Sequence, residues 1–409
     1  MINYDRFFSS AGKKMRESAI RRMGTVIASD ADVISFAAGY PDPDSFPLSA
    51  VRDVMADLLA GTNGDVLQYG PTRGHRQLLD SITELLTSRQ IEATPDELLI
   101  TSGSQQGLDL IARVLVEPGD VVLVELPAYT GAIAAFTNAQ ARLVGITQDE
   151  DGINLINLDE VYLRQRRAER RVSLLYLVPN FQNPTGVLLS QAKRQSLLEW
   201  AERRDVMIIE DDPYGSLYFD GATTKQETRA IRSYDDRGRV IYLSSFSKTL
   251  APGLRVGWMV APATLADRFE TAKQAADLMT GSLDQLVVQE LLHRGTLDEI
   301  VPTLRQLYQR KRDVMERSLR ANLGNNLRWS TPKGGFFVWA TLPDGVDDLT
   351  LLSRALSLRL VLVIGSAFYV NGAGHDRIRL AFSSCTESQI DEGIKRLGSA
   401  LAGPATNSV

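Results

Sequence analysis

Lys248 and its neighbours have the residue types and spacing most suggestive of chemistry. The lysine follows the apolar run at residues 240–243 and precedes Arg255, with Ser245 and Ser247 close by. Burial at a strand end near a second cation disfavours the ammonium form and lowers a lysine pKa below its ordinary value of about 10.4. A neutral lysine amine can form a Schiff base, and hydroxyl groups with an arginine can hold a phosphate. The alternative is a loop lysine that is only solvated.

A second chemistry fits the same residues. The segment Ser245-Phe-Ser-Lys248 matches S-x-x-K, the nucleophile motif of penicillin-recognising enzymes. Those enzymes also need the motifs S-D-N and K-T-G, and the sequence contains neither. The residues around Lys248 therefore favour a Schiff base over acyl transfer.

The composition argues against several classes of protein. The chain has 409 residues, of which 44% are hydrophobic and 23% charged, and its formal net charge of −5 gives no electrostatic case for binding nucleic acid. A single cysteine, Cys385, suits a reducing cytoplasm. The three histidines are too widely spaced to suggest a histidine metal site, and no apolar run is long enough to span a membrane. We expect a cytoplasmic protein with no metal, nucleic-acid or membrane partner.

Short apolar strands alternate with helices in the middle of the chain. The expected strands cover residues 98–101, 121–125, 172–178 and 206–211, and another pair flanks Lys248. This alternation predicts an α/β fold with a mostly parallel sheet and helices on both faces. Ligands bind such sheets beyond the carboxyl ends of the strands. The polar clusters of this sequence all follow strands.

The remaining segments suggest a division into three parts. We expect residues 1–45 to form an N-terminal arm with an amphipathic helix that joins the smaller domain. Residues 46–320 should form the large ligand-binding domain with a linking helix, and residues 321–409 a smaller α+β domain. No Gly/Ser-rich linker separates the last two parts, so continuous helix should join them.

The polar clusters together describe one kind of ligand. Residues 102–107 open a helix directly after a strand, where backbone N–H groups and the helix dipole can receive a phosphate. Asp211, at the end of a buried strand, needs a cation or a proton donor beside it. Tyr129 could stack on a planar ring. Pyridoxal 5'-phosphate fits these features, with its aldehyde on Lys248, its phosphate near Arg255 and its ring nitrogen on Asp211.

Eight motifs in this order resemble the fold-type I pyridoxal-phosphate-dependent aminotransferases. They are Ser102-Gly-Ser-Gln-Gln, Pro127-Ala-Tyr, Asn183-Pro-Thr-Gly, Asp211-Asp-Pro-Tyr, Ser245-Phe-Ser-Lys, Gly253-Leu-Arg, Gly334-Gly-Phe-Phe-Val-Trp and Ile378-Arg-Leu. The resemblance extends from residue 3 to residue 398. Within the family it is closest to the kynurenine/2-aminoadipate aminotransferase-like subgroup, through the phrases Asn3-Tyr-Asp-Arg-Phe7, Ser35-Phe-Ala-Ala-Gly39, Ile208-Ile-Glu-Asp-Asp-Pro-Tyr214 and Ala367-Phe-Tyr-Val370.

The resemblance implies a fold, a cofactor and a reaction. It implies a large, mostly parallel seven-stranded sheet domain and a smaller α+β domain. The cofactor is pyridoxal 5'-phosphate, and the reaction moves the amino group of an α-amino acid (2-aminoadipate, aromatic or kynurenine-like, or another) to a 2-oxo acid such as 2-oxoglutarate. The cycle is of the ping-pong type. The amino donor itself stays open.

The resemblance also assigns cofactor-binding residues. Lys248 carries the cofactor as a Schiff base and then moves the proton, while Asp211 keeps the ring nitrogen protonated. Tyr214 and Asn183 hydrogen-bond the phenolic oxygen, and Tyr129 stacks on the ring. The phosphate-binding positions are Gly103, Ser104, Gln105, Ser245, Ser247 and Arg255, and Tyr69, which reaches the phosphate held by the other subunit. The last position implies a homodimer with shared active sites.

The substrate side of the site is implied in the same way. Arg379 matches the arginine that binds the substrate α-carboxylate with two hydrogen bonds, with Gly39 and Asn183 beside it. Tyr40 stands next to the substrate where relatives usually carry leucine. Arg21 matches a residue that meets distal carboxylates, although Arg22 competes for this role and the alternative is a solvent-facing residue. Two cis peptide bonds are also implied, at Leu126-Pro127 and Asn183-Pro184.

Two other functions remain possible from the sequence. The first is another pyridoxal-phosphate enzyme on the same fold, such as an oxidase, a decarboxylase or a cyclase of specialised metabolism. The second is a non-catalytic regulator domain that senses a ligand. Such regulators carry a basic DNA-binding domain before the arm, whereas this sequence begins at the arm and is acidic overall.

Overall fold

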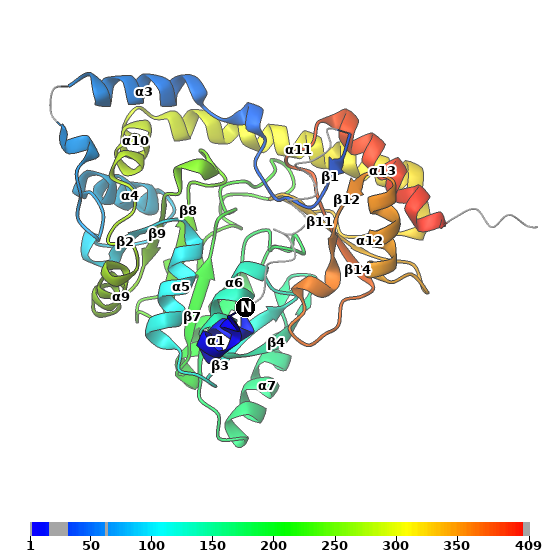
Figure 1. The fold of residues 1–409 in the computed structure, drawn as a ribbon, viewed down its shortest axis with the longest axis horizontal. Coiled ribbons are helices and arrows are strands. Elements are labelled where there is room, and N and C mark those ends of the chain that lie inside the picture. Colours follow the sequence, from blue (N-terminus) through cyan, green and yellow to red (C-terminus); the bar gives the residue numbers. More distant parts are fainter. Residues whose placement is uncertain (1, 16–31, 62–63, 404–409) are drawn as a thin grey trace, which may run out of the picture.

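The large lobe is built on one twisted sheet. The computed structural model describes residues 2–15, 32–61 and 64–403 (Figure 1). The sheet has the strand order β2-β9-β8-β7-β6-β3-β4-β5. Its strands are β2 (Leu98–Thr101), β3 (Val121–Leu126), β4 (Arg142–Asp149), β5 (Gly152–Ile153), β6 (Val172–Leu177), β7 (Met207–Asp211), β8 (Val240–Ser245) and β9 (Gly257–Val260). The strands predicted from apolar runs are confirmed to within two residues.

The pairing of these strands is mostly parallel, as predicted. The pairs β3–β4, β3–β6, β6–β7 and β7–β8 are parallel. Strand β9 is antiparallel to both its neighbours, β2 and β8. The expectation of seven strands is wrong, because the sheet has eight.

The additional strand is the two-residue β5, which folds back antiparallel onto the end of β4. Gly152 begins it with a φ of +111°, a conformation that favours glycine. A two-residue strand is set by the geometry of the turn before it and contains no apolar run. The hydrophobic pattern of the sequence therefore does not predict β5. Strand β4 was also not located from the sequence, because Ile146 is its only fully buried residue.

Successive residues of the strands serve opposite faces of the sheet. In β6, Leu174 and Tyr176 pack on the face covered by α5 and α6, whereas Leu175 and Leu177 pack on the face covered by α7 and α8. The helices of the large lobe are α3 (Leu48–Ala60), α4 (Arg76–Ser88), α5 (Ser104–Leu115), α6 (Thr130–Asn138), α7 (Leu155–Arg167), α8 (Gln191–Arg204), α9 (Ala263–Ala276) and α10 (Ser282–His293). Both faces of the sheet are therefore buried, as its nearly continuous apolar strands predicted.

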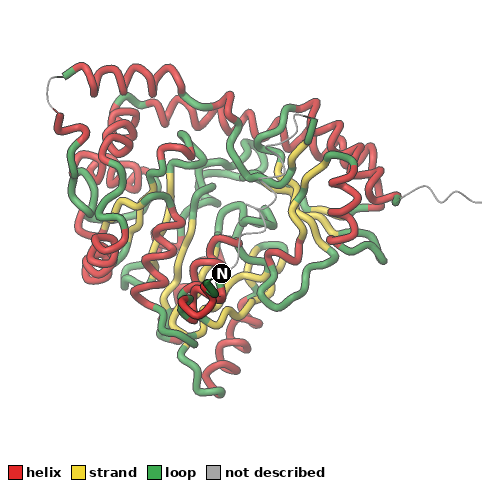
Figure 2. Tube along the Cα trace, in the orientation of Figure 1, coloured by secondary structure: helices red, strands yellow, loops and turns green. Residues whose placement is uncertain are grey.

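A second, smaller sheet lies near the C-terminal end of the chain. Its strands follow the order β10-β11-β14-β13 and are all antiparallel. The elements of this lobe are β10 (Arg328–Trp329), β11 (Phe337–Thr341), α12 (Asp348–Ser357), β12 (Leu360–Val361), β13 (Val363–Ile364), β14 (Arg377–Ala381) and α13 (Glu387–Ala402). The long helix α11 (Thr296–Leu323) runs along the upper edge of Figure 1 from α10 to α13. In Figure 2, loops fill the region between the two sheets.

The first residues of the chain contribute to both lobes. Strand β1 (Ile34–Ser35) pairs parallel with β12 of the smaller lobe. Before it, the structure describes α1 (Ser10–Lys14), which packs near α6. The rest of the expected amphipathic arm, residues 16–31, lies outside the described residues, and Arg21 with it.

Short 3-10 helices complete the connections. They are η1 (Tyr4–Phe7), η2 (Pro43–Ser45), η3 (Gly64–Leu67), η4 (Pro95–Glu97), η5 (Ile231–Tyr234), η6 (Pro252–Leu254), η7 (Gly324–Asn326) and η8 (Gly365–Phe368). None of the helices in the described ranges is both long and apolar enough to cross a bilayer.

Candidate active site

Lys248 lies in the turn between β8 and β9, just beyond the carboxyl end of β8. Its Nζ donates a hydrogen bond to the Gly39 carbonyl oxygen at 2.9 Å. Burial and the positive charges of Arg379 and Arg255, opposed by Asp211, together lower the pKa of Lys248 to about 8. This is the direction that the sequence predicted. The amine therefore loses its proton much more easily than an exposed lysine does.

Asp211 ends strand β7 on the same face of the sheet. The Tyr176 hydroxyl donates to its Oδ2 at 3.0 Å, whereas Oδ1 is buried and has no hydrogen-bond partner among the described residues. Burial raises the pKa of Asp211 to about 7. A buried carboxylate oxygen without a donor is costly, so this atom fits a donor that comes from a ligand. A protonated ring nitrogen is such a donor.

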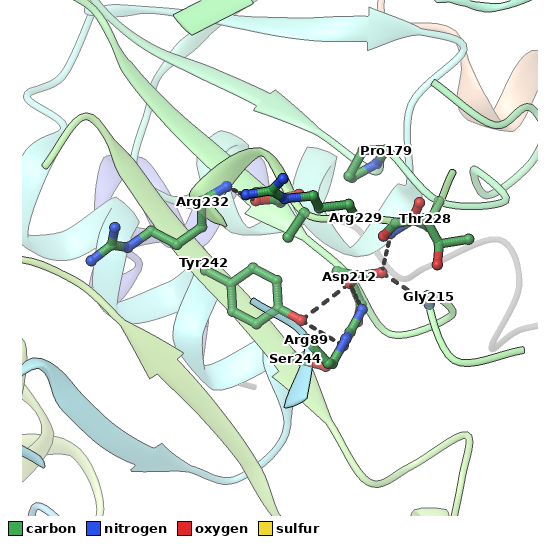
Figure 3. A network of polar contacts seen from close by, with 12 residues as sticks. Arg89, Pro179, Asp212, Gly215, Thr228, Arg229, Arg232, Tyr242 and Ser244 are labelled. Atoms are coloured by element: carbon green, nitrogen blue, oxygen red, sulfur yellow. Dashed lines mark hydrogen bonds and ion pairs between the residues drawn. The ribbon is translucent and has the colours of Figure 1, made fainter. Parts of the chain in front are cut away.

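The acids on either side of Asp211 face the other way. Glu210 accepts hydrogen bonds from the backbone N–H groups of Ile231 and Arg232, both at 2.8 Å. Figure 3 shows the Arg89 guanidinium and the Tyr242 hydroxyl pointing at Asp212, at distances of 2.5 and 3.1 Å from Oδ2. These two acids are thus satisfied by the protein itself, unlike Asp211.

The loop before α5 is shaped to receive an anion. Gly103 caps the helix with a φ of +77°, and as a glycine it supplies no side chain to bond the first N–H groups of α5. A Cβ on Gly103 would stand 2.5 Å from Nη2 of Arg255, so glycine allows the arginine to come close. Arg255 donates to the Ser102 carbonyl at 2.7 Å, and the buried Ser104 Oγ has no partner in the described part of the chain. A helix N-terminus, a hydroxyl and an arginine together fit a phosphate.

The other predicted phosphate-binding residues border this loop. Ser245 is buried at the end of β8, and its Oγ accepts from the Ser247 backbone N–H at 3.2 Å. Gln105 donates from its side chain to the Gly131 carbonyl at 3.0 Å. A Cβ on Gly131 would meet the Tyr129 ring at 2.4 Å, which places that ring beside the start of α6 and close to Gln105.

A partly buried network that the sequence did not suggest lies beside the loop. Gln106 Oε1 accepts from the Ser102 backbone N–H at 2.8 Å and from Lys273 Nζ at 2.6 Å. Its Nε2 donates to Asp277 at 2.6 Å, and Asp277 also pairs with Lys273. Gln106 therefore holds the loop in place from the side away from Lys248. Its position next to Gln105 in the polar motif was the only signal in the sequence.

Arg379 lies in the middle of β14, where it is 1% exposed. It donates from Nη1 to Asn183 Oδ1 at 2.8 Å and from Nη2 to the Ala37 carbonyl, and its Nε has no partner within the described ranges. Its guanidinium lies 4.4 Å from the centre of the Phe337 ring, and burial lowers its pKa to about 10. A buried guanidinium with one free N–H fits a carboxylate ligand.

Gly39 connects this arginine to the lysine. A Cβ on Gly39 would stand 2.6 Å from the Phe337 ring, so only glycine lets the loop approach so closely. The loop is fixed by Ser383, whose hydroxyl donates to the Tyr40 carbonyl at 2.6 Å, and by the buried ion pair of Lys311 with Asp42 at 2.5 Å. The Tyr40 side chain is 61% exposed and makes no such contact.

The structure thus brings most of the predicted site residues together and leaves some apart. Tyr214 is buried near Lys248, whose Nζ lies 5.9 Å from the centre of its ring, and burial raises the pKa of Tyr214 far above its ordinary value. The bonds Leu126-Pro127 and Asn183-Pro184 are both cis, as the resemblance implied. Tyr69 is 78% exposed and lies away from the other site residues of its own chain.

These features define the class of the protein. The unpaired Asp211 oxygen, the anion-binding loop and the lysine of lowered pKa fit the ring nitrogen, phosphate and aldehyde of pyridoxal 5'-phosphate. With a mostly parallel sheet carrying them at its strand ends, they are the features of a fold-type I pyridoxal-phosphate-dependent transferase.

Comparison with known proteins gives the family. The profile of the family "Aminotransferase class I and II" matches residues 31–397, and the chain belongs to this family. It is 37% identical over 401 residues to aromatic-amino-acid aminotransferase 1 of Thermococcus litoralis, covering 98% of this chain and 95% of the relative. It is also 37% identical over 402 residues to the 2-aminoadipate transaminase of Thermus thermophilus, covering 98% of each chain.

A solved structure agrees with these relatives. The kynurenine aminotransferase of Pyrococcus horikoshii, solved with PMP and with KYN as substrates and KYA as products, superimposes with a TM-score of 0.92. The two chains are 38% identical, and the match covers 98% of each. The protein is therefore a pyridoxal-phosphate-dependent aminotransferase, which moves an amino group between an amino acid and a 2-oxo acid.

Proposed function

We propose that the amino donor is an α-amino acid with a large side chain, of the 2-aminoadipate, kynurenine-like or aromatic kind, and that 2-oxoglutarate is the acceptor. The names of the relatives support this range of donors. The observation that carries the proposal is Arg379, whose buried Nε is left without a partner among the described residues. This group suits the α-carboxylate that amino acids and 2-oxo acids share.

Each cofactor-binding residue has a proposed task. When bound, pyridoxal phosphate supplies an electron sink for the substrate Cα. Lys248 Nζ holds the cofactor and then takes and returns the Cα proton, which its lowered pKa favours. Asp211 accepts a hydrogen bond from the ring nitrogen, and Tyr214 and Asn183 donate to the phenolic oxygen. Tyr129 would stack on the ring, and the residues that would hold the phosphate are Gly103, Ser104, Gln105, Ser245, Ser247 and Arg255.

The substrate would be bound near Arg379 and Gly39. Arg379 and Asn183 hold the α-carboxylate, and Gly39 lets the loop of residues 39–45 lie close to Phe337 beside it. The exposed ring of Tyr40 borders the substrate side chain. We retain Arg21 as the residue that meets a distal carboxylate, with Arg22 as the alternative; both lie outside the described residues.

We also propose a homodimer with shared active sites. Tyr69 is 78% exposed and Leu67 69% exposed, and such side chains commonly lie in an interface. In the dimer Tyr69 would reach the phosphate of the partner subunit. The division into an arm at residues 1–45, a large domain at 46–320 and a small domain at 321–409 is part of the same proposal, as is a cytoplasmic location, which rests on the single Cys385.

A panel of amino donors tests the proposal. Purified enzyme loaded with pyridoxal phosphate is given 2-aminoadipate, kynurenine, phenylalanine, tyrosine, leucine or aspartate with 2-oxoglutarate, and glutamate formation is measured. We expect the fastest turnover among the first four donors. Aspartate as the best donor would contradict the proposed side-chain preference. Product formed without any 2-oxo acid would instead favour an oxidase, decarboxylase or cyclase, and donor binding without turnover would favour a ligand-sensing role.

A further inference from the structure

A pocket of about 560 Å³ lies on the side of the large sheet away from Asp211. It is bounded by the end of α4, by the loop of residues 215–229 that follows β7, and by the first turns of α11. Four basic side chains line it (Arg89, Lys225, Arg229 and Arg305) and one acidic side chain, Asp298. The chain as a whole carries a net charge of −5, so this concentration of positive charge is unusual for the protein.

Three of these cations form no ion pair in the described part of the chain, although the charge of Asp220 acts on Arg305. Arg305 lies 3.6 Å from the centre of the Tyr218 ring and donates to the Ser216 carbonyl at 2.8 Å. Arg229 donates to Ser233 at 2.8 Å. Neither of them, nor Lys225, forms an ion pair with a carboxylate within residues 2–15, 32–61 and 64–403. Burial lowers the pKa of Arg305, so an added anion would lower the cost of its charge.

The fourth cation, Arg89, connects the pocket to the acids of β7. Its side chain is only 14% exposed, with Nη2 2.5 Å from Asp212 and Nη1 donating to the Tyr242 hydroxyl at 2.8 Å (Figure 3). Asp212 also accepts from the Gly215 backbone N–H at 2.9 Å, and Gly215 lines the pocket. This side of the pocket is therefore a hydrogen-bonded turn, which holds Arg89 in place.

We propose that this pocket binds a small polyanion, with two or more carboxylate or phosphate groups. Guanidinium groups present planar pairs of N–H donors that match both kinds of oxyanion. The volume suits a small molecule. The site is separate from the proposed phosphate-binding loop, because it lies across the sheet from Lys248 and shares no residue with that loop.

Calorimetric titration of the enzyme loaded with pyridoxal phosphate tests the proposal. Pyrophosphate and citrate, which carry two phosphate and three carboxylate groups, are titrated separately at low ionic strength, so that the two arms distinguish a phosphate from a carboxylate ligand. We expect saturable binding of at least one anion. The double variant Lys225→Gln/Arg305→Gln should weaken it about tenfold or more, a loss of about 1.4 kcal/mol or more, since it removes two cationic donors from the pocket.

Two further variants complete the experiment. Lys225→Gln alone changes an exposed residue, and it should fold and weaken binding by a smaller factor even if the double variant is unstable. Arg310→Gln, an exposed position farther along α11 that does not line the pocket, is the matched control and should bind as the wild type does. The proposal is overturned if neither anion binds saturably, or if binding survives unchanged in the Lys225 and Arg305 variants, which would place the anion elsewhere, for example at Arg379.

Discussion

The buried acids on the two faces of strand β7 differ in how completely they are hydrogen-bonded by the protein. Toward α8 and α4, Glu210 accepts from two backbone N–H groups and Asp212 from Arg89, Tyr242, Asn180 and Gly215. Toward Lys248, Asp211 keeps one oxygen without a partner among the described residues. Buried polar groups are normally satisfied. The difference therefore separates acids that stabilise the fold from the acid that is left for a ligand.

The largest expected effect is on the face of Asp211. Lys248→Ala should lower the rate of amino transfer by about 10⁴-fold, because it removes the group that holds the cofactor and moves the proton. The visible absorbance of the bound cofactor should also change its wavelength. Lys395→Ala, at an exposed position of α13, is the control and should retain both activity and spectrum. Activity within tenfold of the wild type in Lys248→Ala would refute the role of the lysine.

The next largest effect is on stability, and it concerns Asp212 on the opposite face of the sheet. Asp212→Ala should lower the free energy of unfolding by about 3–5 kcal/mol, because it leaves the mostly buried Arg89 without its partner. Asp211→Asn should not lower the free energy of unfolding of the cofactor-free protein at neutral pH, and should raise it, because it removes a buried carboxylate whose ionisation burial disfavours. Urea denaturation of both variants measures the contrast. Equal losses would show that the two faces do not differ in the way we describe.

The pH dependence of stability gives a second test of the state of Asp211. The folded pKa of Asp211 is raised to about 7 from its ordinary 3.8, so between these values the folded protein holds a proton that the unfolded chain has lost. This contribution is fully present below pH 3.8 and is lost as the pH rises to about 7. The stability of the cofactor-free wild type relative to Asp211→Asn should therefore fall across this window. A difference that is independent of pH would contradict the raised pKa.

The contrast between the two faces could be predicted from the sequence only in part. Three consecutive acids after an apolar run, Glu210, Asp211 and Asp212, imply opposite faces because side chains alternate along a strand. Its place at the end of a buried strand then singled out Asp211 as the acid that needs a cation or a proton donor, and the resemblance agreed. The sequence could not identify the partner of Asp212, because Arg89 lies 123 residues earlier and pairs with it only through the tertiary fold. Strand β5 was missed for a similar reason, since its short pairing carries no apolar pattern.

A smaller effect is expected at the substrate-binding arginine. Arg379→Lys should lower kcat/KM for amino acids and 2-oxo acids alike by about 10- to 100-fold, because lysine cannot offer two parallel N–H donors to a carboxylate. Arg377→Lys is the matched control at the start of the same strand, where the arginine pairs with Asp376 and not with a site residue. Unchanged kinetics of Arg379→Lys, or an equal loss in both variants, would count against the proposed carboxylate site.

The smallest expected effect concerns the hydrogen-bonded network of Gln106, Lys273 and Asp277. It tests whether this network affects cofactor binding by holding the loop before α5 in place. Gln106 connects the Ser102 backbone to Lys273 and Asp277, so Gln106→Met should let the loop shift and weaken binding of pyridoxal phosphate about tenfold. The kcat of the fully loaded variant should stay unchanged, because Gln106 contacts none of the groups assigned to proton transfer. Gln274→Met, on the exposed side of α9, is the control. A lower kcat with unaltered cofactor affinity would mean that Gln106 acts on the reaction itself. In that case a side chain whose hydrogen bonds are all made within the protein would take part in function, and the contrast drawn between Asp212 and Asp211 would not hold for Gln106.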